Sequence, residues 1–380
     1  MNRSVEPAGS SIRPRVRQLL RGLTHDPVLL ALLALLALQT VLAPARIAHY
    51  PALVDWPTIA ALAGLLLLTK GLEQSGALDR LGRWMIARMP TRRAAALALV
   101  LAAATLAMVL TNDVALFVVV PLTLGMCRIA RIAPGRLIVF EALAVNAGSA
   151  LTPIGNPQNL FLWQRSGVSF GAFVLQMAPL VAVLMALLLA LTAVSFPARA
   201  MRVRLDGDAP ATDRRLLALS LVLYLPFLVL ADLHHAPAAL GVLVLVFVLL
   251  RARLLLQIDW GLLLVFVLMF VDLRLLAQQE VVRSAMNRLD LAQPAHLLFA
   301  GALLSQFISN VPASIALADY SRDWRTIAWG VDIGGFGLII GSLANLIALR
   351  LAREPGAWRR FHLYSVPFLV AALVVGWILL

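Results

Sequence analysis

Four polar or helix-breaking segments interrupt long apolar runs in this chain of 380 residues. Two are short, residues 111–113 (Thr-Asn-Asp) and 309–311 (Ser-Asn-Val), and two are longer and rich in glycine, residues 148–159 and 334–345. In apolar surroundings, non-helical backbone persists only inside protein or around an aqueous site. At such breaks the free N–H groups of helix N-termini can bind an anion, whereas carbonyl, Asn and Ser oxygens can coordinate a cation. These four segments are therefore the candidate binding site.

The segments form two matched pairs. Four positions of the first half recur in the second at one constant separation, namely Asn146 with Asp332, Gly148 with Gly334, Gly155 with Gly341 and Asn159 with Asn345. Upstream, Asn112 precedes Pro121 as Asn310 precedes Pro312. Paired, interrupted segments in corresponding halves are the best sequence indication of a transporter binding site. Glycine and proline kinks are common in single membrane helices, but that alternative does not account for two matched pairs.

Two acidic residues lie at these breaks. A carboxylate beside a break within the membrane is costly and usually functional, so Asp113 is a candidate proton carrier or cation ligand. Capping of the following helix by the Asp113 side chain is the alternative. Asp332 stands where the first half has Asn146, so only one half carries a charge there, and a role in substrate or ion binding is expected. Glu141, Asp232, Asp272 and Asp319 are instead expected near helix ends, where interfacial water solvates them.

All candidate ligands of the substrate or coupling ion lie in or beside the four segments. They are Thr111, Asn112, Asp113, Asn146, Gly148, Thr152, Gly155, Asn156, Asn159, Ser309, Asn310, Asp332, Gly334, Gly341, Ser342 and Asn345. Among them, Asn112 and Asn310 are the candidate Na⁺ ligands. No P-loop, GxSxG or HExxH pattern and no pair of catalytic carboxylates is present. We therefore expect no enzymatic activity, no catalytic residue, no resident metal and no cofactor beyond a coupling ion, H⁺ or Na⁺. The single cysteine, Cys127, excludes an internal disulfide.

Composition identifies the elements that must position these residues. Hydrophobic residues make up 61% of the chain and charged residues 13%, against about 25% charged residues in soluble domains. A globule of this size has too little interior to hide so much apolar surface. The chain is therefore predicted to be an all-α polytopic membrane protein with about nine full crossings of roughly 20 residues each, plus two hairpins.

The polar stretch of residues 198–215 separates two halves. The predicted units are a basic cytoplasmic N-terminus (1–25), a first transmembrane repeat (26–197), a cytoplasmic inter-repeat loop (198–215), and a linking helix with a second, inverted transmembrane repeat (216–380). Each repeat is expected to hold one re-entrant helical hairpin, with its tip at Asn112 or Asn310, and one broken transmembrane helix. The apolar run from about residue 27 to 42 is interpreted as a retained first helix, because Pro44 lies inside the only resemblance to a signal-peptide cleavage site.

The net charge of +13 would suggest a nucleic-acid partner in a soluble protein, but here the aromatic residues lie in apolar runs, away from the basic ones. With a cytoplasmic N-terminus, all but seven of the 32 basic residues fall in cytoplasmic loops, as the positive-inside rule requires. The seven on the outer side are Arg46, Arg165, Arg274, Arg283, Arg288, Arg322 and Arg325. Under this topology the run 53–69 leads inward and its match 259–277 leads outward, so the repeats are inverted. The expected surroundings are a lipid bilayer, with no nucleic acid.

Four stretches carry a resemblance to a known family. They are LTNDVALFVVVPL (110–122), NAGSALTPIGNPQNLFLW (146–163), SNVPASIAL (309–317) and GVDIGGFGLIIGSLANLIA (330–348). With them the chain resembles the ion-transporter superfamily, which holds citrate and divalent-anion permeases, arsenite-efflux permeases and certain Na⁺/H⁺ antiporters. It is most similar to the citrate-transporter-like permeases of the bacterial inner membrane, over nearly all of the chain from about residue 28.

The resemblance implies two hairpins and two broken helices around a central substrate, elevator-type alternating access and, in many members, a homodimer. The expected function is secondary transport of a small anion, a carboxylate or inorganic oxyanion, across the bacterial cytoplasmic membrane with H⁺ or Na⁺. Na⁺/H⁺ antiport on the same fold is the alternative. Dicarboxylate members carry Ser-Asn-Thr at each hairpin tip. Here both tips, at Asn112 and Asn310, keep the Asn and lack the final Thr, which argues against dicarboxylate specificity and is closer to the arsenite and Na⁺/H⁺ branches.

Overall fold

The structure is a computed structural model that describes residues 27–380, except residues 87, 131, 201–210, 353 and 355. The predicted basic N-terminus (1–25) and most of the predicted inter-repeat loop lie outside the described residues. The described residues form helices and no β-sheet, with one isolated bridge between Thr91 and Ala200. The all-α prediction is confirmed.

Most of the helices follow one another with short connections, whereas α10 and α11 are separated by residues 196–213. They are α2 (Pro27–Leu42), η1 (Pro44–His49), α3 (Tyr50–Leu53), α4 (Trp56–Gln74), α5 (Ala77–Ile86), α6 (Arg92–Val109), α7 (Asn112–Ala130), α8 (Gly135–Ser149), α9 (Pro157–Ser166), α10 (Phe170–Ser195), α11 (Arg214–Asp232), α12 (Ala236–Arg251), η2 (Ala252–Leu254), α13 (Trp260–Ala277), α14 (Glu280–Asn287), α15 (Pro294–Ile308), α16 (Asn310–Ala318), α17 (Trp324–Gly334), η3 (Ile339–Gly341), α18 (Leu343–Ala352) and α19 (Ala357–Leu379).

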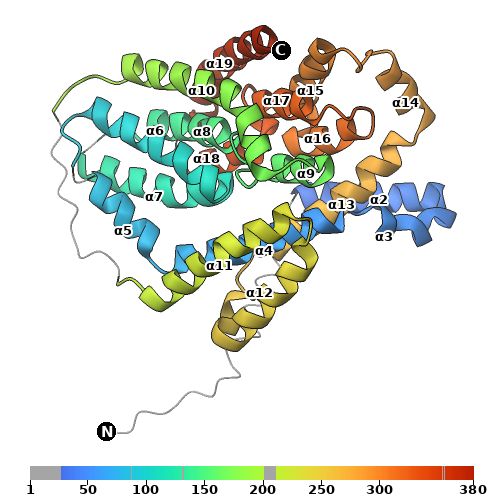
Figure 1. Ribbon diagram of the computed structural model, residues 1–380. Helices are drawn as coiled ribbons and strands as arrows, with labels where there is room; N and C mark the ends of the chain where they lie inside the picture. Colours follow the sequence, from blue (N-terminus) through green and yellow to red (C-terminus); the bar gives the residue numbers. More distant parts are fainter. Residues whose placement is uncertain (1–26, 87, 131, 201–210, 353, 355) are drawn as a thin grey trace.

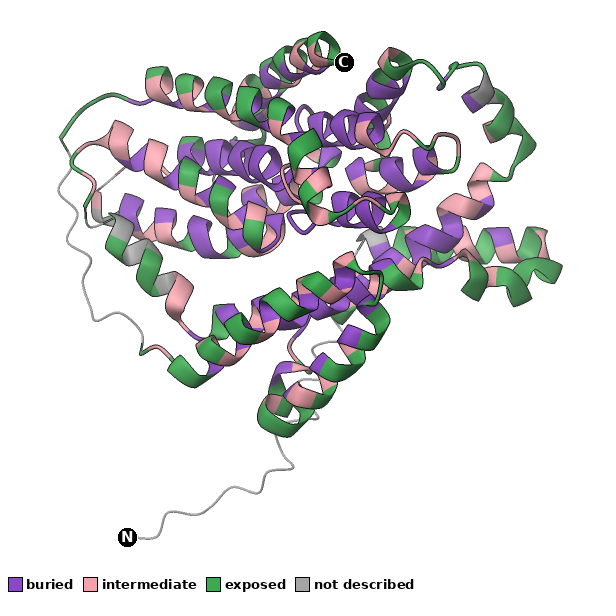
Figure 2. Cartoon of the chain, viewed as in Figure 1, coloured by how far each residue is buried: buried purple, intermediate pink, exposed green. Residues whose placement is uncertain are grey.

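Two groups of helices are distinguishable in Figure 1. The first, here called the panel, comprises α2–α4 and α11–α13, in which α4 packs against α11 and α12, and α13 packs against α2. The second, the bundle, comprises α6–α10 and α15–α19. Figure 2 shows the buried residues concentrated in the bundle, above all in α8, α9 and α17. The panel meets the bundle where α4 packs on α9 and α13 packs on α16.

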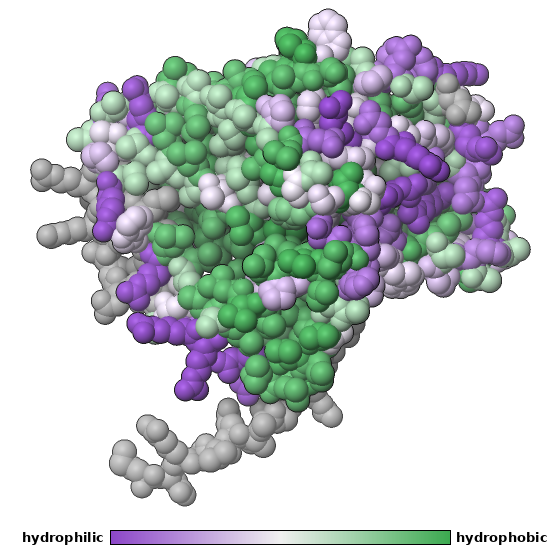
Figure 3. Space-filling view, in the orientation of Figure 1, coloured by the Kyte–Doolittle hydropathy of each residue, from purple (hydrophilic) through white to green (hydrophobic). Residues whose placement is uncertain are grey.

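The described helices are those of a multi-pass membrane protein. Six are long and apolar enough to cross a membrane, and the bent pair Leu29–Leu42 with Pro44–Leu53 would make a seventh. Helices α8, α9, α17 and α18 have 15 residues or fewer, because the chain breaks between the members of each pair, so length alone does not count them as spans. Figure 3 shows hydrophobic residues gathered across the middle of the molecule and hydrophilic residues toward its left and right ends, as expected for a protein that spans a bilayer.

Helices end at each of the four segments singled out in the sequence. Helix α6 ends at Val109 and α7 begins at Asn112, while α15 and α16 are separated by Ser309 alone. Ser309 has a φ of 72°, a left-handed conformation that costs a non-glycine residue free energy and breaks the helix. The other two breaks separate α8 from α9 and α17 from α18.

Glycines bring one arm of each hairpin against a broken helix. A Cβ on Gly148 would lie 2.6 Å from the Cα of Ala104, so α6 and α8 are in backbone contact. A Cβ on Gly334 would lie 3.0 Å from the Cα of Ala302, so α15 and α17 approach in the same way. The matched glycines of the sequence therefore occupy equivalent packing positions.

One end of the panel is held by Asp213, which lies just before α11. Its carboxylate accepts hydrogen bonds from the backbone N–H groups of Leu216 (3.0 Å) and Arg215 (3.1 Å) and pairs with Arg251 of α12 at 3.2 Å. The hydrogen bond from Leu216, supported by the charge of Arg251, lowers the pKa of this carboxyl. The cap thus joins the starting end of α11 to the last turn of α12.

Candidate functional site

Two asparagines and a backbone carbonyl form the centre of the bundle. The Asn146 side-chain amide donates to Asn345 Oδ1 at 2.8 Å and to the carbonyl oxygen of Gly335 at 3.2 Å. The Asn345 amide donates to the same carbonyl at 2.8 Å. Both asparagines are buried. This cluster joins α8 of the first half to α18 and the break after α17 in the second.

Asp332 lies in the last turn of α17, buried with 2% of its surface exposed. Its Oδ1 accepts hydrogen bonds from the side-chain amides of Asn156 (3.1 Å) and Gln158 (3.0 Å), both from the first half. Its Oδ2 is shielded from solvent and has no hydrogen-bond partner among the described residues. A buried carboxylate oxygen without a partner can accept a proton or coordinate a cation.

The break between α8 and α9 is held by its own polar side chains. Asn156 caps α9, accepting from the N–H of Asn159 at 2.9 Å, and donates to Ser149 Oγ at 3.2 Å. The Thr152 hydroxyl donates to the carbonyl of Met108 at 2.6 Å, which fixes this break to the end of α6. Because the N–H of Asn112 also donates to the carbonyl of Gly155 at 2.9 Å, the first hairpin tip is attached to the same segment.

At the first hairpin tip, the free N–H groups of α7 are satisfied by the neighbours of Asp113 rather than by Asp113. Asn112 Oδ1 accepts from the N–H of Asp113 at 2.9 Å, and Thr111 Oγ1 accepts from the N–H of Val114 at 3.4 Å. The half-buried Asp113 has an Oδ1 that is shielded from solvent and unpartnered in the described part of the protein. The capping alternative for Asp113 is therefore wrong, and its carboxylate is free of a local structural role.

At the second hairpin tip, Asn310 lies against the central cluster. A Cβ on Gly335 would lie 3.3 Å from Asn310 Nδ2 and 3.6 Å from Asn146 Cγ. The absence of a side chain at Gly335 leaves room for the tip, α8 and the break of the second half to meet at this point.

The break between α17 and α18 is held by two residues, Gln306 and Ser365, that the sequence patterns did not indicate. Gln306 Nε2 donates to the carbonyls of Gly334 (2.7 Å) and Phe336 (3.2 Å), and its Oε1 accepts from the N–H of Leu338 at 2.8 Å. Ser365 of α19 accepts from the N–H of Gly337 at 2.8 Å. The available signal for Gln306 was an amide in an apolar run four residues before Asn310. Gln158 was visible in the TPIGNPQN motif.

The remaining predicted ligands have less direct positions. Gly148 and Gly334 serve close helix packing, and Gly341 packs on the carbonyl oxygens of Gly334 and Phe336. Ser342 is buried with a hydroxyl that has no partner among the described residues.

Two carboxylates expected at solvated helix ends are instead buried, which corrects that interpretation. Glu141 lies in the middle of α8, where the Thr123 hydroxyl donates to it, and Asp272 lies in α13, where Gln39 donates to it at 3.0 Å. The sequence pattern suggested a solvated position for both carboxylates, because a polar partner on another helix cannot be detected from the sequence. No group of three or more His, Cys, Asp or Glu residues capable of holding a metal ion occurs in the described part of the chain.

Comparison with known proteins gives consistent matches. The model of the citrate transporter family matches residues 21–331. The inner membrane protein YbiR of Escherichia coli (strain K12) is 48% identical over 331 residues, which cover 87% of this chain and 89% of that protein. The uncharacterized transporter MJ0456 of Methanocaldococcus jannaschii is 31% identical over 345 residues, 90% and 93% of the two chains. The uncharacterized transporter Rv2684 of Mycobacterium tuberculosis is 29% identical over 353 residues, 80% of each.

Proposed function

The chain belongs to the citrate transporter family, and on that premise we propose that this membrane transporter moves a small anion, a carboxylate or inorganic oxyanion, by secondary active transport coupled to H⁺ or Na⁺. The membrane is the bacterial cytoplasmic membrane, with the N-terminus on the cytoplasmic side. It is a transporter and not an enzyme, in agreement with the names of its relatives.

One observation carries the proposal: four helices begin at the four breaks, and hydrogen bonds connect those breaks to one another. Helices α7, α9, α16 and α18 start at Asn112, Pro157, Asn310 and Leu343. Helix N-termini present the positive end of the helix dipole, even where, as at α7 and α9, side chains and carbonyls of the breaks accept from their first N–H groups. Carbonyl and amide oxygens of the same breaks are suited to a cation. An anion and a coupling ion can therefore bind side by side.

The arrangement of the two groups of helices supports an elevator-type movement. The residues of the candidate site belong to the bundle, whereas the panel contributes none of them. In this proposal the bundle slides along the panel and carries the site between the two sides of the membrane. The equivalent packing of Gly148 and Gly334 supports the two inverted repeats of the proposal, and a homodimer formed by the panel completes it.

Na⁺/H⁺ antiport is the second candidate, and the free Oδ2 of Asp332 favours it. A carboxylate among amide side chains is a suitable Na⁺ or H⁺ ligand. Proteoliposomes separate the two functions: flux that follows a trial anion such as citrate or arsenite supports anion transport, whereas Na⁺-dependent proton movement without an anion supports antiport.

The site assignment is tested by flux through Asn112→Ala and Asn310→Ala proteins in proteoliposomes. We expect each to lower flux about tenfold, the effect of one lost hydrogen bond to a charged ligand. Gln279→Ala, an amide removed from an exposed position outside the site, should transport like the wild type. Wild-type flux from both asparagine variants would refute the assignment.

A further inference from the structure

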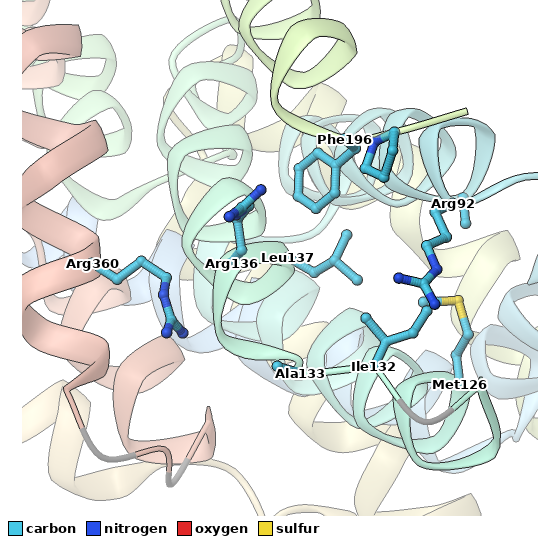
Figure 4. A pocket seen from close by; sticks show the side chains of 10 residues that line it. Arg92, Met126, Ile132, Ala133, Arg136, Leu137, Phe196 and Arg360 are labelled. Carbon is cyan, nitrogen blue, oxygen red and sulfur yellow. The ribbon is translucent and has the colours of Figure 1, made fainter. Parts of the chain in front are cut away.

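A basic cavity lies away from the centre, at the end of the bundle where α6, α8 and α19 begin. Its volume is about 390 Å³, within the range of about 300–1,000 Å³ usual for small-molecule sites. Figure 4 shows its lining from close by. Its lining includes three arginines and apolar side chains, among them Arg92, Arg136, Arg360, Met126, Ile132 and Phe196.

Within the described part of the chain, two of the three arginines have no acidic partner. Arg360 pairs with Glu354 at 2.7 Å. Arg136 donates to the carbonyl of Ser195 at 2.8 Å, a neutral acceptor. The Arg92 side chain makes no hydrogen bond or ion pair within the described residues, and Figure 4 shows its guanidinium directed toward Met126 and Ile132. None of the described lining residues is acidic.

The rest of the lining is apolar, and its inner part is buried, whereas Ala133 and Pro197 are exposed at its rim. Ala95 and Met126 are each 1% exposed, and Phe196 is 7% exposed. A small hydrated anion that entered would exchange water for these walls, which is unfavourable. An amphiphile fits both the basic and the apolar part of the cavity, because its anionic group can pair with the arginines while its apolar part covers the walls. Close in sequence to the lining residues Phe196 and Arg360, the side chains of Val194 and Leu363 are 79% and 68% exposed and offer apolar surface for an acyl chain.

We propose that this cavity binds the headgroup phosphate of an anionic phospholipid, with Arg92 and Arg136 as its ligands. Basic pockets between membrane helices at the bilayer surface recognise lipid headgroups in this way, and the guanidinium fork matches phosphate oxygens. The positive end of α6, which begins at Arg92, adds to the attraction, whereas the start of α8 at Gly135 already faces the carboxylate of Glu354. The site is separate from the transport site, so it stands whether or not the chain carries an anion.

Native mass spectrometry of the purified full-length protein tests the proposal through titration with phosphatidylglycerol. We expect the wild type to bind this lipid, and the Arg92→Gln protein to bind it about tenfold more weakly, since one charge-assisted contact is lost. Arg128→Gln removes the same charge from the end of α7, outside the cavity, and should bind like the wild type. Equal affinities for all three proteins would overturn the proposal.

Further measurements distinguish a lipid headgroup from a free phosphate, and a second variant controls for misfolding. Zwitterionic phosphatidylcholine should bind more weakly than phosphatidylglycerol, and soluble glycerol phosphate should not displace the lipid. Equal binding of phosphatidylcholine, or full displacement by glycerol phosphate, would exclude an anionic-lipid site. Ala133→Trp fills the cavity from an exposed connecting residue without a change of charge. This variant should abolish lipid binding while it elutes as a monodisperse protein, and retained binding would contradict the location.

Discussion

At the scale of single residues, the two acidic groups of the site have different surroundings. Asp332 is buried and accepts two amide hydrogen bonds through one oxygen, so part of its role is to hold the first half against the second. Asp113 is half-buried, accepts no hydrogen bond within the described residues, and lies in the first turn of α7. A group without a structural role can change protonation without disrupting the fold, so we propose Asp113 as the proton-carrying residue.

The exchange Asp113→Asn is therefore expected to flatten the pH dependence of flux in proteoliposomes, because the amide cannot bind or release the proton. Asp290→Asn is the matched control: it removes an exposed carboxylate outside the site, at a φ of 47° that Asn adopts readily. Its pH profile should match that of the wild type. Identical profiles for all three proteins would remove Asp113 from proton coupling.

At the scale of elements, the site depends on helices that stop within the bundle and on glycines that let their neighbours approach. The backbones of α6 and α8 are in contact at Gly148 and Ala104, and this contact sets the position of the break that follows α8. Gln306 holds the break between α17 and α18 in position, because its side chain donates to a backbone carbonyl of that break and accepts from one of its N–H groups. Helix packing therefore determines where the polar segments lie.

Gly148→Ala should destabilise the protein by about 1–3 kcal/mol, the usual cost of an added methyl group in a tightly packed core. The new Cβ would lie 2.6 Å from the Cα of Ala104, and backbone cannot move aside as a side chain can. Thermal unfolding in detergent measures the effect. Gly125→Ala in α7 introduces the same group with nothing within 4 Å and should not lower the melting temperature. Equal melting temperatures for the two variants would show that α6 and α8 can move apart to accommodate the added methyl group.

At the scale of the whole molecule, the panel and the bundle touch along few elements. One polar contact between them is the Tyr320 hydroxyl, which follows α16 and donates to the carbonyl of Ala277 at the end of α13 at 2.8 Å. If the bundle slides along the panel during transport, this pair must separate. A covalent link across the pair would then hold the protein in one state.

A reducible crosslinker between Ala277→Cys and Tyr320→Cys, in a Cys127→Ala background, is expected to abolish flux until the link is reduced. Asp213→Cys with Arg251→Cys places the same link within the panel, where the two side chains already lie 3.2 Å apart, and flux should continue. Mass spectrometry verifies each link. Undiminished flux through the linked Ala277–Tyr320 pair would exclude sliding at this boundary.

Much of the fold and part of the site followed from the sequence. The apolar runs predicted helices, and the Asn, Gly and Pro pattern marked the four places where helices end, because both are local properties of the chain. The roles of Gln306 and Ser365 could not be predicted, since their partners are backbone groups that a break exposes from another helix. Glu141 and Asp272 were misplaced for the same reason: their partners, Thr123 and Gln39, come from other helices.

The sequence by itself determined that the chain is helical and membrane-spanning, that its halves are matched, and that Asn112, Asn146, Asn310 and Asn345 are candidate ligands. Only the tertiary structure decided that Asn146 and Asn345 share the carbonyl of Gly335, that Asp332 receives its partners from the other half, and that the Asp113 carboxylate has no hydrogen-bond partner among the described residues. Periodicity and motif spacing report which residues share a helix or a break. Hydrogen bonds between segments far apart in the chain depend on how closely helix backbones approach, and that distance is set by packing across the whole bundle.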